Sequence, residues 1–179
     1  MTKILAFAGS NSPVSINHEL ILNVVGRITE HEIEVLKLRE LEIPMYSNAR
    51  EKIGIPENIK LLYEKILDHQ ALIISVNEHN RNVSAFFKNI LDWLSRIDRK
   101  FMEGKKILLM STSPGQRGGA ASLEYCKLQF PRFGGEIVES FSLPQFYENF
   151  DAAKGTLSNE VFEMGVVEVV TSFSQLIKE

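Results

Sequence analysis

The stretch from Gly9 to Asn17 has the residue types and spacing best suited to binding chemistry. It has no lysine or arginine, and its hydroxyl and amide side chains come from Ser10, Asn11, Ser12, Ser15 and Asn17. An apolar segment precedes it and a helical pattern follows, so we expect a turn from a first strand into a first helix. Amides that begin a helix have no internal acceptor and carry partial positive charge, which suits phosphate. The stretch predicts either a phosphate-binding loop or an ordinary loop with a serine or asparagine N-cap.

Two further polar stretches each follow a buried strand. Residues 77–82 read Asn-Glu-His-Asn-Arg-Asn, and residues 113–119 read Ser-Pro-Gly-Gln-Arg-Gly-Gly. The glycines of the later stretch would let its backbone come close to a flat ligand. Ligands of open parallel sheets bind beyond the carboxyl ends of the strands, so one ligand with a phosphate and a planar ring would use all three loops. The alternative is that these loops are polar only because loops usually are.

The elements that must position these loops follow from hydrophobic periodicity. We expect strands at 3–8, 31–38, 71–76, 107–112 and 136–143, with 31–38 at an edge because it alternates. We expect helices at 15–30, 57–68, 84–97, 120–130 and 159–177, and a long aromatic loop between the last strand and the last helix. The alternation of strands and helices predicts a three-layer α/β fold, a parallel sheet with helices on both faces, formed by a single domain over 1–179.

Composition excludes several classes of function. The net charge of −3 gives no general attraction to nucleic acid or to an anionic membrane, and no apolar run reaches membrane-spanning length. The single cysteine, Cys126, cannot form an internal disulfide, so we expect a packing role for it and a cytoplasmic protein without a signal peptide. The four histidines are not spaced as a metal site, and we predict none. The G-x-S-x-G elbow of hydrolases is missing from the sequence. The P-loop pattern is also missing, so nucleotide hydrolysis is not expected.

The polar loops also carry a family resemblance. Residues 77–82, followed by Phe-Lys-Asn-Ile-Leu-Asp-Trp-Leu-Ser at 87–95, resemble the NAD(P)H-dependent FMN reductase family, which typically has P-E-Y-N-G-S and then L-K-N-A-I-D-W-L-S. The loops 9–17 and 113–119 are similar to its phosphate loop and its third flavin loop, and the likeness runs through most of the chain. It implies a flavodoxin-like fold whose five-stranded parallel sheet has the order 2-1-3-4-5.

The resemblance implies an FMN site made of these three loops. The first loop would hold the phosphate through Ser10, Ser15 and Asn17, with Ser12 and Ile16 beside them. The second would line the ring and ribityl chain through Asn77, Glu78, His79, Asn80 and Arg81. The third would contact the far part of the ring through Ser113, Pro114, Gly115 and Gln116. No side chain is assigned a catalytic role, because the cofactor would carry the chemistry.

The chain departs from the family pattern at four of these positions. Ser12 stands where the family usually has arginine, so we expect phosphate binding to rest on amides and hydroxyls. Asn77, His79 and Arg81 stand where proline, tyrosine and glycine are usual. If the turn at Arg81 needs a positive φ, the arginine is strained there; otherwise its side chain reaches the flavin or the nicotinamide nucleotide.

The resemblance implies an oxidoreductase with ping-pong kinetics. NAD(P)H would transfer hydride to FMN and leave, and a quinone, azo compound, metal ion or flavin would then take the electrons. The alternatives are a non-catalytic electron-transfer module that binds flavin and an interaction protein without flavin. The resemblance also implies a homodimer or homotetramer, in which the loop Pro44-Met45-Tyr46 reaches a neighbouring subunit's flavin.

A few other residues have competing interpretations. Trp93 lies either at a subunit contact or at a packing edge, and Asp92 and Arg96 are expected to pair on the helix surface. The aromatic residues of the long loop form a lid, an interface or a satellite hydrophobic cluster; they are Phe146, Tyr147 and Phe150.

Overall fold

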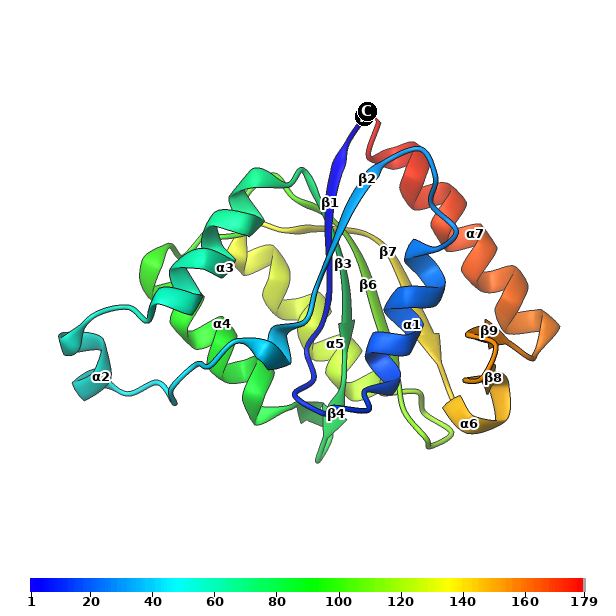
Figure 1. Cartoon of the computed structure of the whole chain (residues 1–179), viewed down its shortest axis with the longest axis horizontal. Helices are drawn as coiled ribbons and strands as arrows, with labels where there is room; N and C mark the ends of the chain where they lie inside the picture. Colours follow the sequence, from blue (N-terminus) through cyan, green and yellow to red (C-terminus); the bar gives the residue numbers. More distant parts are fainter. Residues whose placement is uncertain (179) are drawn as a thin grey trace.

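Five parallel strands form the central sheet of the computed structural model, which describes residues 1–178 (Figure 1). Across the sheet the order is β2 (Glu32–Leu36), β1 (Lys3–Ala8), β3 (Ala71–Val76), β6 (Lys106–Thr112) and β7 (Glu136–Leu143). This is the predicted order 2-1-3-4-5 when the five strands are numbered along the chain. The predicted edge position of the second strand is therefore confirmed.

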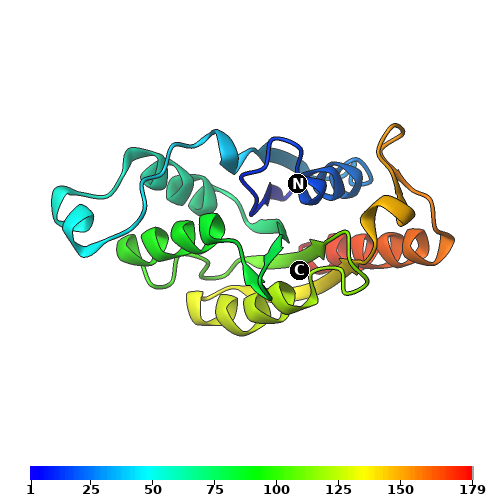
Figure 2. The same cartoon turned by 90° about the horizontal axis from the view of Figure 1, so that it is seen from below.

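Helices cover both faces of the sheet. Figure 2 shows α1 (Ile16–Val25) and α7 (Glu160–Leu176) on one side, with α3 (Glu57–Asp68), α4 (Ala85–Ile97) and α5 (Ala120–Gln129) on the other. Successive side chains of a strand point to opposite faces, so Ile4 and Ala6 pack under α1 and α7 while Leu5 and Phe7 pack under the other helices. The predicted three-layer flavodoxin-like architecture is confirmed.

Several element boundaries differ from the sequence-based expectation. α1 ends at Val25 rather than near residue 30, because Gly26 caps it and a tighter turn through residues 27 and 28 leads into β2. The charged segment before α3 forms a short helix, α2 (Asn48–Ile53), whose N-cap Ser47 accepts a hydrogen bond from the Arg50 amide. In Figure 1 this helix lies at the end of an arm that projects from the domain. A 3₁₀ turn, η1 (Leu38–Glu40), follows β2, and a second, η2 (Phe130–Phe133), follows α5.

The long aromatic loop is structured. It contains the helix α6 (Phe146–Asn149) and a hairpin of β8 (Phe150–Asp151) and β9 (Thr156–Leu157). Phe146 and Phe150 are buried and stack with their ring centroids 4.6 Å apart, which supports the hydrophobic-cluster interpretation for these two residues. Tyr147 instead is 71% exposed.

Two side chains of α4, Asn89 and Trp93, anchor the loop before α2. Trp93 is fully buried, and its indole Nε1 donates to the Pro44 carbonyl at 2.8 Å. Asn89 also donates to that carbonyl and accepts from the Tyr46 amide. Trp93 thus packs inside the subunit. The predicted Asp92–Arg96 pair is wrong: Asp92 accepts from Lys88 one turn earlier, and the Arg96 guanidinium lies over the Tyr46 ring.

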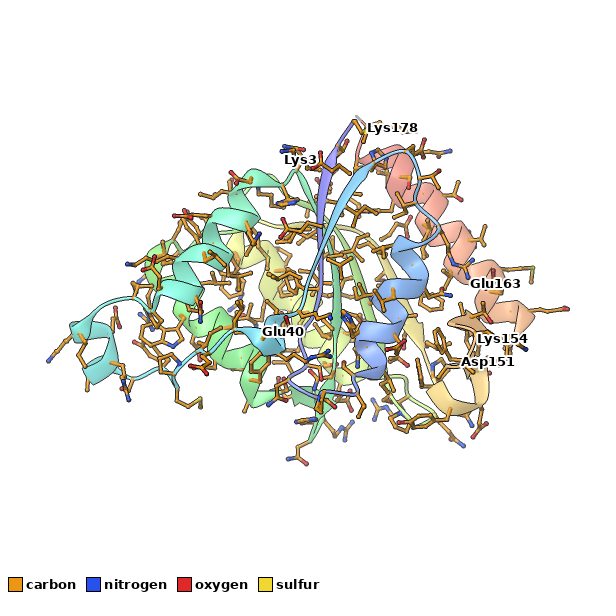
Figure 3. All side chains as sticks on the ribbon, viewed as in Figure 1. Lys3, Glu40, Asp151, Lys154, Glu163 and Lys178 are labelled. Atoms are coloured by element: carbon orange, nitrogen blue, oxygen red, sulfur yellow. The ribbon has the colours of Figure 1, made fainter. Side chains whose placement is uncertain are left out.

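A bidentate ion pair joins the turn that follows α1 to α7. Arg27 donates to both carboxylate oxygens of Glu163 at 2.6 and 2.8 Å, and Figure 3 labels Glu163 on α7.

On the other face of the sheet, Cys126 is buried in the core, where burial raises the pKa of its thiol. The packing role expected for this cysteine is therefore confirmed. None of the helices over residues 1–178 is long and apolar enough to cross a membrane.

Candidate functional site

The three polar loops meet beyond the carboxyl ends of β1, β3 and β6, where they enclose a cavity of about 180 Å³. Most of the predicted site residues line it: Ser10, Ser12, Ser15, Ile16, Asn17, Asn77, Glu78, His79, Ser113 and Pro114. Asn80, Arg81, Gly115 and Gln116 are not among its lining residues, and their roles remain predictions. The topology therefore brings together one candidate site from segments more than a hundred residues apart in sequence.

The first loop presents hydroxyl groups as donors. The Oγ atoms of Ser10, Ser12 and Ser15 each accept a hydrogen bond from a backbone amide of the same segment, at 3.2 to 3.3 Å. Within residues 1–178 none of these hydroxyls donates to a protein acceptor, so each O–H proton is free for a ligand. The amides of Ile16 and Asn17 begin α1 and have no intrahelical acceptor. Both the N-cap and the anion-binding interpretations therefore apply to Ser15.

Asn17 fixes the loop against the sheet. Its Oδ1 accepts from the Ser75 hydroxyl at 2.7 Å and from the Thr112 amide at 3.1 Å, and its Nδ2 donates to the Thr112 carbonyl. The residue is only 2% exposed. Its side chain thus joins α1 with the ends of β3 and β6, and its backbone amide is available to a ligand.

Gly9 allows a close contact at the start of the same loop. A Cβ atom there would lie 2.8 Å from the Phe87 ring, too close for a real contact. The Gly9 carbonyl accepts from the Ser84 hydroxyl, which also caps α4. Glycine at this position lets the phosphate-loop segment rest directly on α4.

The second loop is a tight hairpin rather than an open turn. β4 (Glu78–His79) pairs with β5 (Asn82–Val83), and Asn80 and Arg81 form the connection with φ of 51° and 63°. Two-residue hairpin turns of this kind need positive φ at both central residues, which asparagine tolerates and arginine does not favour. The conditional expectation that Arg81 is strained is confirmed.

Glu78 connects the second loop to the third. Its Oε2 accepts hydrogen bonds from the amides of Ala121 at 2.8 Å and Ser122 at 3.2 Å, in the first turn of α5. The local N-cap of α5 is Gly119, which has no side chain to cap the helix. The carboxylate therefore serves as a cap from another loop, and its negative charge is stabilised at a helix N-terminus.

Asn77 and His79 add polar groups between the loops. The Asn77 Nδ2 donates to Nε2 of His79 at 3.4 Å, and the Asn77 Oδ1 is buried without a hydrogen-bond partner among residues 1–178. A buried acceptor without a partner costs roughly 1–3 kcal/mol. A donor from a ligand in this cavity would satisfy it.

Two glycines of the third loop, Gly118 and Gly119, serve internal packing, and the expectation that this loop's backbone comes close to a flat ligand stays a prediction. A Cβ on Gly118 would clash with the Ser142 hydroxyl and lie 2.9 Å from the Pro144 nitrogen, and one on Gly119 would crowd Ser111 at 3.2 Å. Both have positive φ, and neither lines the cavity. They let the loop lie against the end of β7.

Three cavity residues were not predicted as site residues: Val14, Thr112 and Tyr147. Val14 and Thr112 are adjacent in sequence to the predicted site residues Ser15 and Ser113, so this adjacency could have identified them. Tyr147 comes from α6, and only the tertiary fold brings it to the loops; the sequence offered its aromatic character alone. A larger hollow of about 560 Å³ runs along the edge strand β7 but contains none of the predicted site residues. Among residues 1–178 no group of three histidine, cysteine or acidic side chains could hold a metal ion.

Comparisons with known proteins agree with this geometry. The family model for NADPH-dependent FMN reductase matches residues 2–148. The quinone reductase of Escherichia coli K12 is 27% identical over 169 residues, covering 88% of each chain. The NADPH:quinone oxidoreductase of Arabidopsis thaliana is 25% identical over 182 residues, covering 96% of this chain and 90% of that one.

Among solved structures, the flavoenzyme NAD(P)H:(acceptor) oxidoreductase FerB from Paracoccus denitrificans superposes with a TM-score of 0.79 and 25% identity. The superposition covers 99% of this chain and 98% of FerB. The family match over most of the chain, the strand order and the convergence of three polar loops at one sheet edge lead to the same conclusion. The chain belongs to the NADPH-dependent FMN reductase family and is an oxidoreductase with a flavodoxin-like fold.

Proposed function

We propose that this protein binds FMN at the three-loop cavity and transfers electrons from NAD(P)H to a small-molecule acceptor by a ping-pong mechanism. The observation that carries the proposal is the donor set of the first loop, three free hydroxyl protons and the first amides of α1 at one end of the cavity. Such a set is complementary to a phosphate group. Glu78 also lines the cavity, and hydrogen bonds from the first amides of α5 compensate part of its negative charge.

The remaining cavity residues fit the rest of a flavin nucleotide. The unpartnered Asn77 Oδ1 offers an acceptor for a ribityl hydroxyl or a ring N–H, and His79, Pro114 and Tyr147 offer flat or apolar surfaces for a ring. The cavity is smaller than the roughly 300–1,000 Å³ of sites that enclose a drug-sized ligand. We infer that it holds the phosphate and ribityl portion and that the ring lies at its rim, open to NAD(P)H and to the acceptor.

When bound, FMN would supply the hydride and electron transfer. The chain's own residues then bind the cofactor, orient it and polarise it. The serine hydroxyls and α1 amides hold the phosphate, the Asn17 side chain keeps this loop in register with β3 and β6, and Glu78 holds the hairpin against α5. No side chain needs to donate or accept a proton for this chemistry.

We propose that the active form is a homodimer or homotetramer whose contacts include the arm that carries α2. Met45 and Ile53 on this arm are 68% and 82% exposed, so the arm presents two large apolar side chains that a second subunit would cover. Hydrogen bonds from Asn89 and Trp93 to the Pro44 carbonyl anchor the base of this arm on α4.

Steady-state kinetics test the proposed function. After reconstitution with FMN, oxidation of NADH or NADPH is measured against a benzoquinone, an azo dye, ferric citrate and free riboflavin. Parallel double-reciprocal lines with at least one acceptor are expected for a ping-pong mechanism. Retained FMN without oxidation of either nucleotide would instead indicate an electron-transfer module, and failure to bind FMN would indicate an interaction protein.

A further inference from the structure

We propose that Arg39 supplies the positive charge that the phosphate loop itself lacks, from a different element of the fold. The inference rests on the proposed function, since it takes the phosphate of FMN as the ligand of the first loop. It adds a cation to the amides and hydroxyls on which phosphate binding was expected to rest. Arg39 acts as a positioning and electrostatic residue, with no part in the redox step.

The guanidinium of Arg39 is bound to the loop. Its Nη1 donates to the carbonyl of Ser12 at 3.4 Å, across 27 residues of sequence. Ser12 is the position where the resembling family usually has arginine. A cation therefore lies at this part of the loop after all, brought there by η1, which follows the edge strand β2.

Arg39 lines a crevice that shares two serines with the cavity. A narrow crevice of about 10 Å³ is lined by Arg39 and His18 together with Ser10 and Ser15, the same serines that line the larger cavity. A crevice of this size holds about one water molecule and no larger ligand. Ser10 and Ser15 thus lie next to both the crevice that Arg39 lines and the proposed phosphate position.

The charge on Arg39 is available to a ligand because no carboxylate neutralises it directly. Within residues 1–178 no acidic side chain lies within ion-pair distance of Arg39, and the adjacent Glu40, labelled in Figure 3, pairs with Lys37 at 3.8 Å. Arg39 is half-buried, so solvent screens it less than a fully exposed arginine. Its field also reaches His18, whose pKa is lowered mainly by burial and next by Arg39.

Arginine is well suited to this position. Its planar guanidinium stays charged at all physiological pH values and carries five N–H donors, of which one holds the Ser12 carbonyl. The contact with Ser12 fixes the guanidinium beside the phosphate position before the ligand arrives. The attraction acts on the phosphate and leaves the uncharged flavin ring unaffected.

FMN and riboflavin separate this effect from a structural role, because they differ only in the phosphate. The full-length protein is titrated with each flavin, and binding is followed by quenching of flavin fluorescence. We expect Arg39→Gln to weaken FMN binding by roughly five- to tenfold at low salt and riboflavin binding by less than about twofold. Arg39→Lys should restore most of the loss, and the salt dependence of FMN binding should be shallower in Arg39→Gln.

The matched control is Arg132→Gln, which removes an exposed arginine from η2, near the amino end of β7. It should leave both affinities unchanged. Equal losses for FMN and riboflavin in Arg39→Gln, or no loss for either, would overturn the inference while the proposed function stands. If the wild-type protein binds no FMN, the proposed function fails and the inference fails with it.

Discussion

The carboxylate of Glu78 accepts the backbone amide of Ala121 at 2.8 Å, and this bond joins two loops of the candidate site. Forty-three residues separate the partners, and the helix that Glu78 caps begins with a glycine that cannot cap it. One side chain therefore sets the position of the hairpin that carries His79 and stabilises the start of α5. Site geometry and fold stability are coupled at this point.

Replacing Glu78 with alanine should destabilise the protein by about 1–2 kcal/mol, because the first amides of α5 lose a charged cap. Chemical denaturation measures the loss. Glu64→Ala removes an exposed carboxylate from α3 and should change stability by less than about 0.5 kcal/mol. Equal stabilities of the two variants would show that the Glu78 cap contributes nothing.

Arg81 is expected to tolerate glycine, unlike ordinary exposed residues. Its φ of 63° costs roughly 1 kcal/mol for a side chain with a Cβ, and relief of this strain offsets the extra freedom that glycine gives the unfolded chain. Arg81→Gly should therefore be neutral to slightly stabilising in a thermal melt. Lys60→Gly, in the exposed interior of α3, should cost about 1 kcal/mol. A comparable loss in Arg81→Gly would show that the turn is not strained.

His18 should make stability depend on pH. Burial, and then Arg39, lowers its pKa in the folded protein below the ordinary value of 6.5, so the unfolded chain binds the proton more readily. Stability contributed by the neutral imidazole is complete above pH 6.5 and is lost as the pH falls toward the lowered pKa. Urea denaturation at pH 7.5 and pH 5.5 should show a decline that is smaller in His18→Gln. An identical decline in both proteins would assign it to other groups.

Substitutions at Ser15 distinguish its role as the N-cap of α1 from its proposed role in binding the phosphate. Ser15→Asp keeps a side-chain acceptor for the His18 amide, so the helix should retain its cap and the protein its melting temperature. The added negative charge should repel a phosphate and weaken FMN binding by more than tenfold, measured by fluorescence titration. Ser15→Asn, also a good cap but uncharged, should lose much less. Similar affinities in the two variants would contradict phosphate binding at this loop.

Local sequence pattern and family resemblance predicted the strands, the main helices and the strand order of the sheet well. The central strands β1, β3 and β6 are short apolar runs, because burial on both sides of a sheet dictates their composition. Hydrophobic residues at helical spacing mark α3 and α4. The stretch Gly9–Asn17 was found from residue type alone, since hydroxyls and amides between a strand and a helix suit either a cap or an anion.

What could not be predicted depends on contacts between distant segments. The family resemblance predicted that Glu78 lines the flavin site; it does line the cavity, but no local pattern predicted that its carboxylate would also accept from amides of α5. Nor did any local pattern predict that the missing Cβ of Gly118 makes room for Ser142 and Pro144. The position of Arg39 beside Ser12 depends on where η1 packs after β2, which no local pattern encodes.

The visible spectrum of the purified protein under anaerobic conditions, before and after addition of NADPH or NADH, tests the central claim most directly. The proposed function predicts flavin absorbance near 450 nm after incubation with FMN and removal of excess, and bleaching of this band by at least one of the nucleotides. A protein that stays colourless after incubation with FMN, or whose bound flavin keeps its absorbance with both nucleotides, would contradict it.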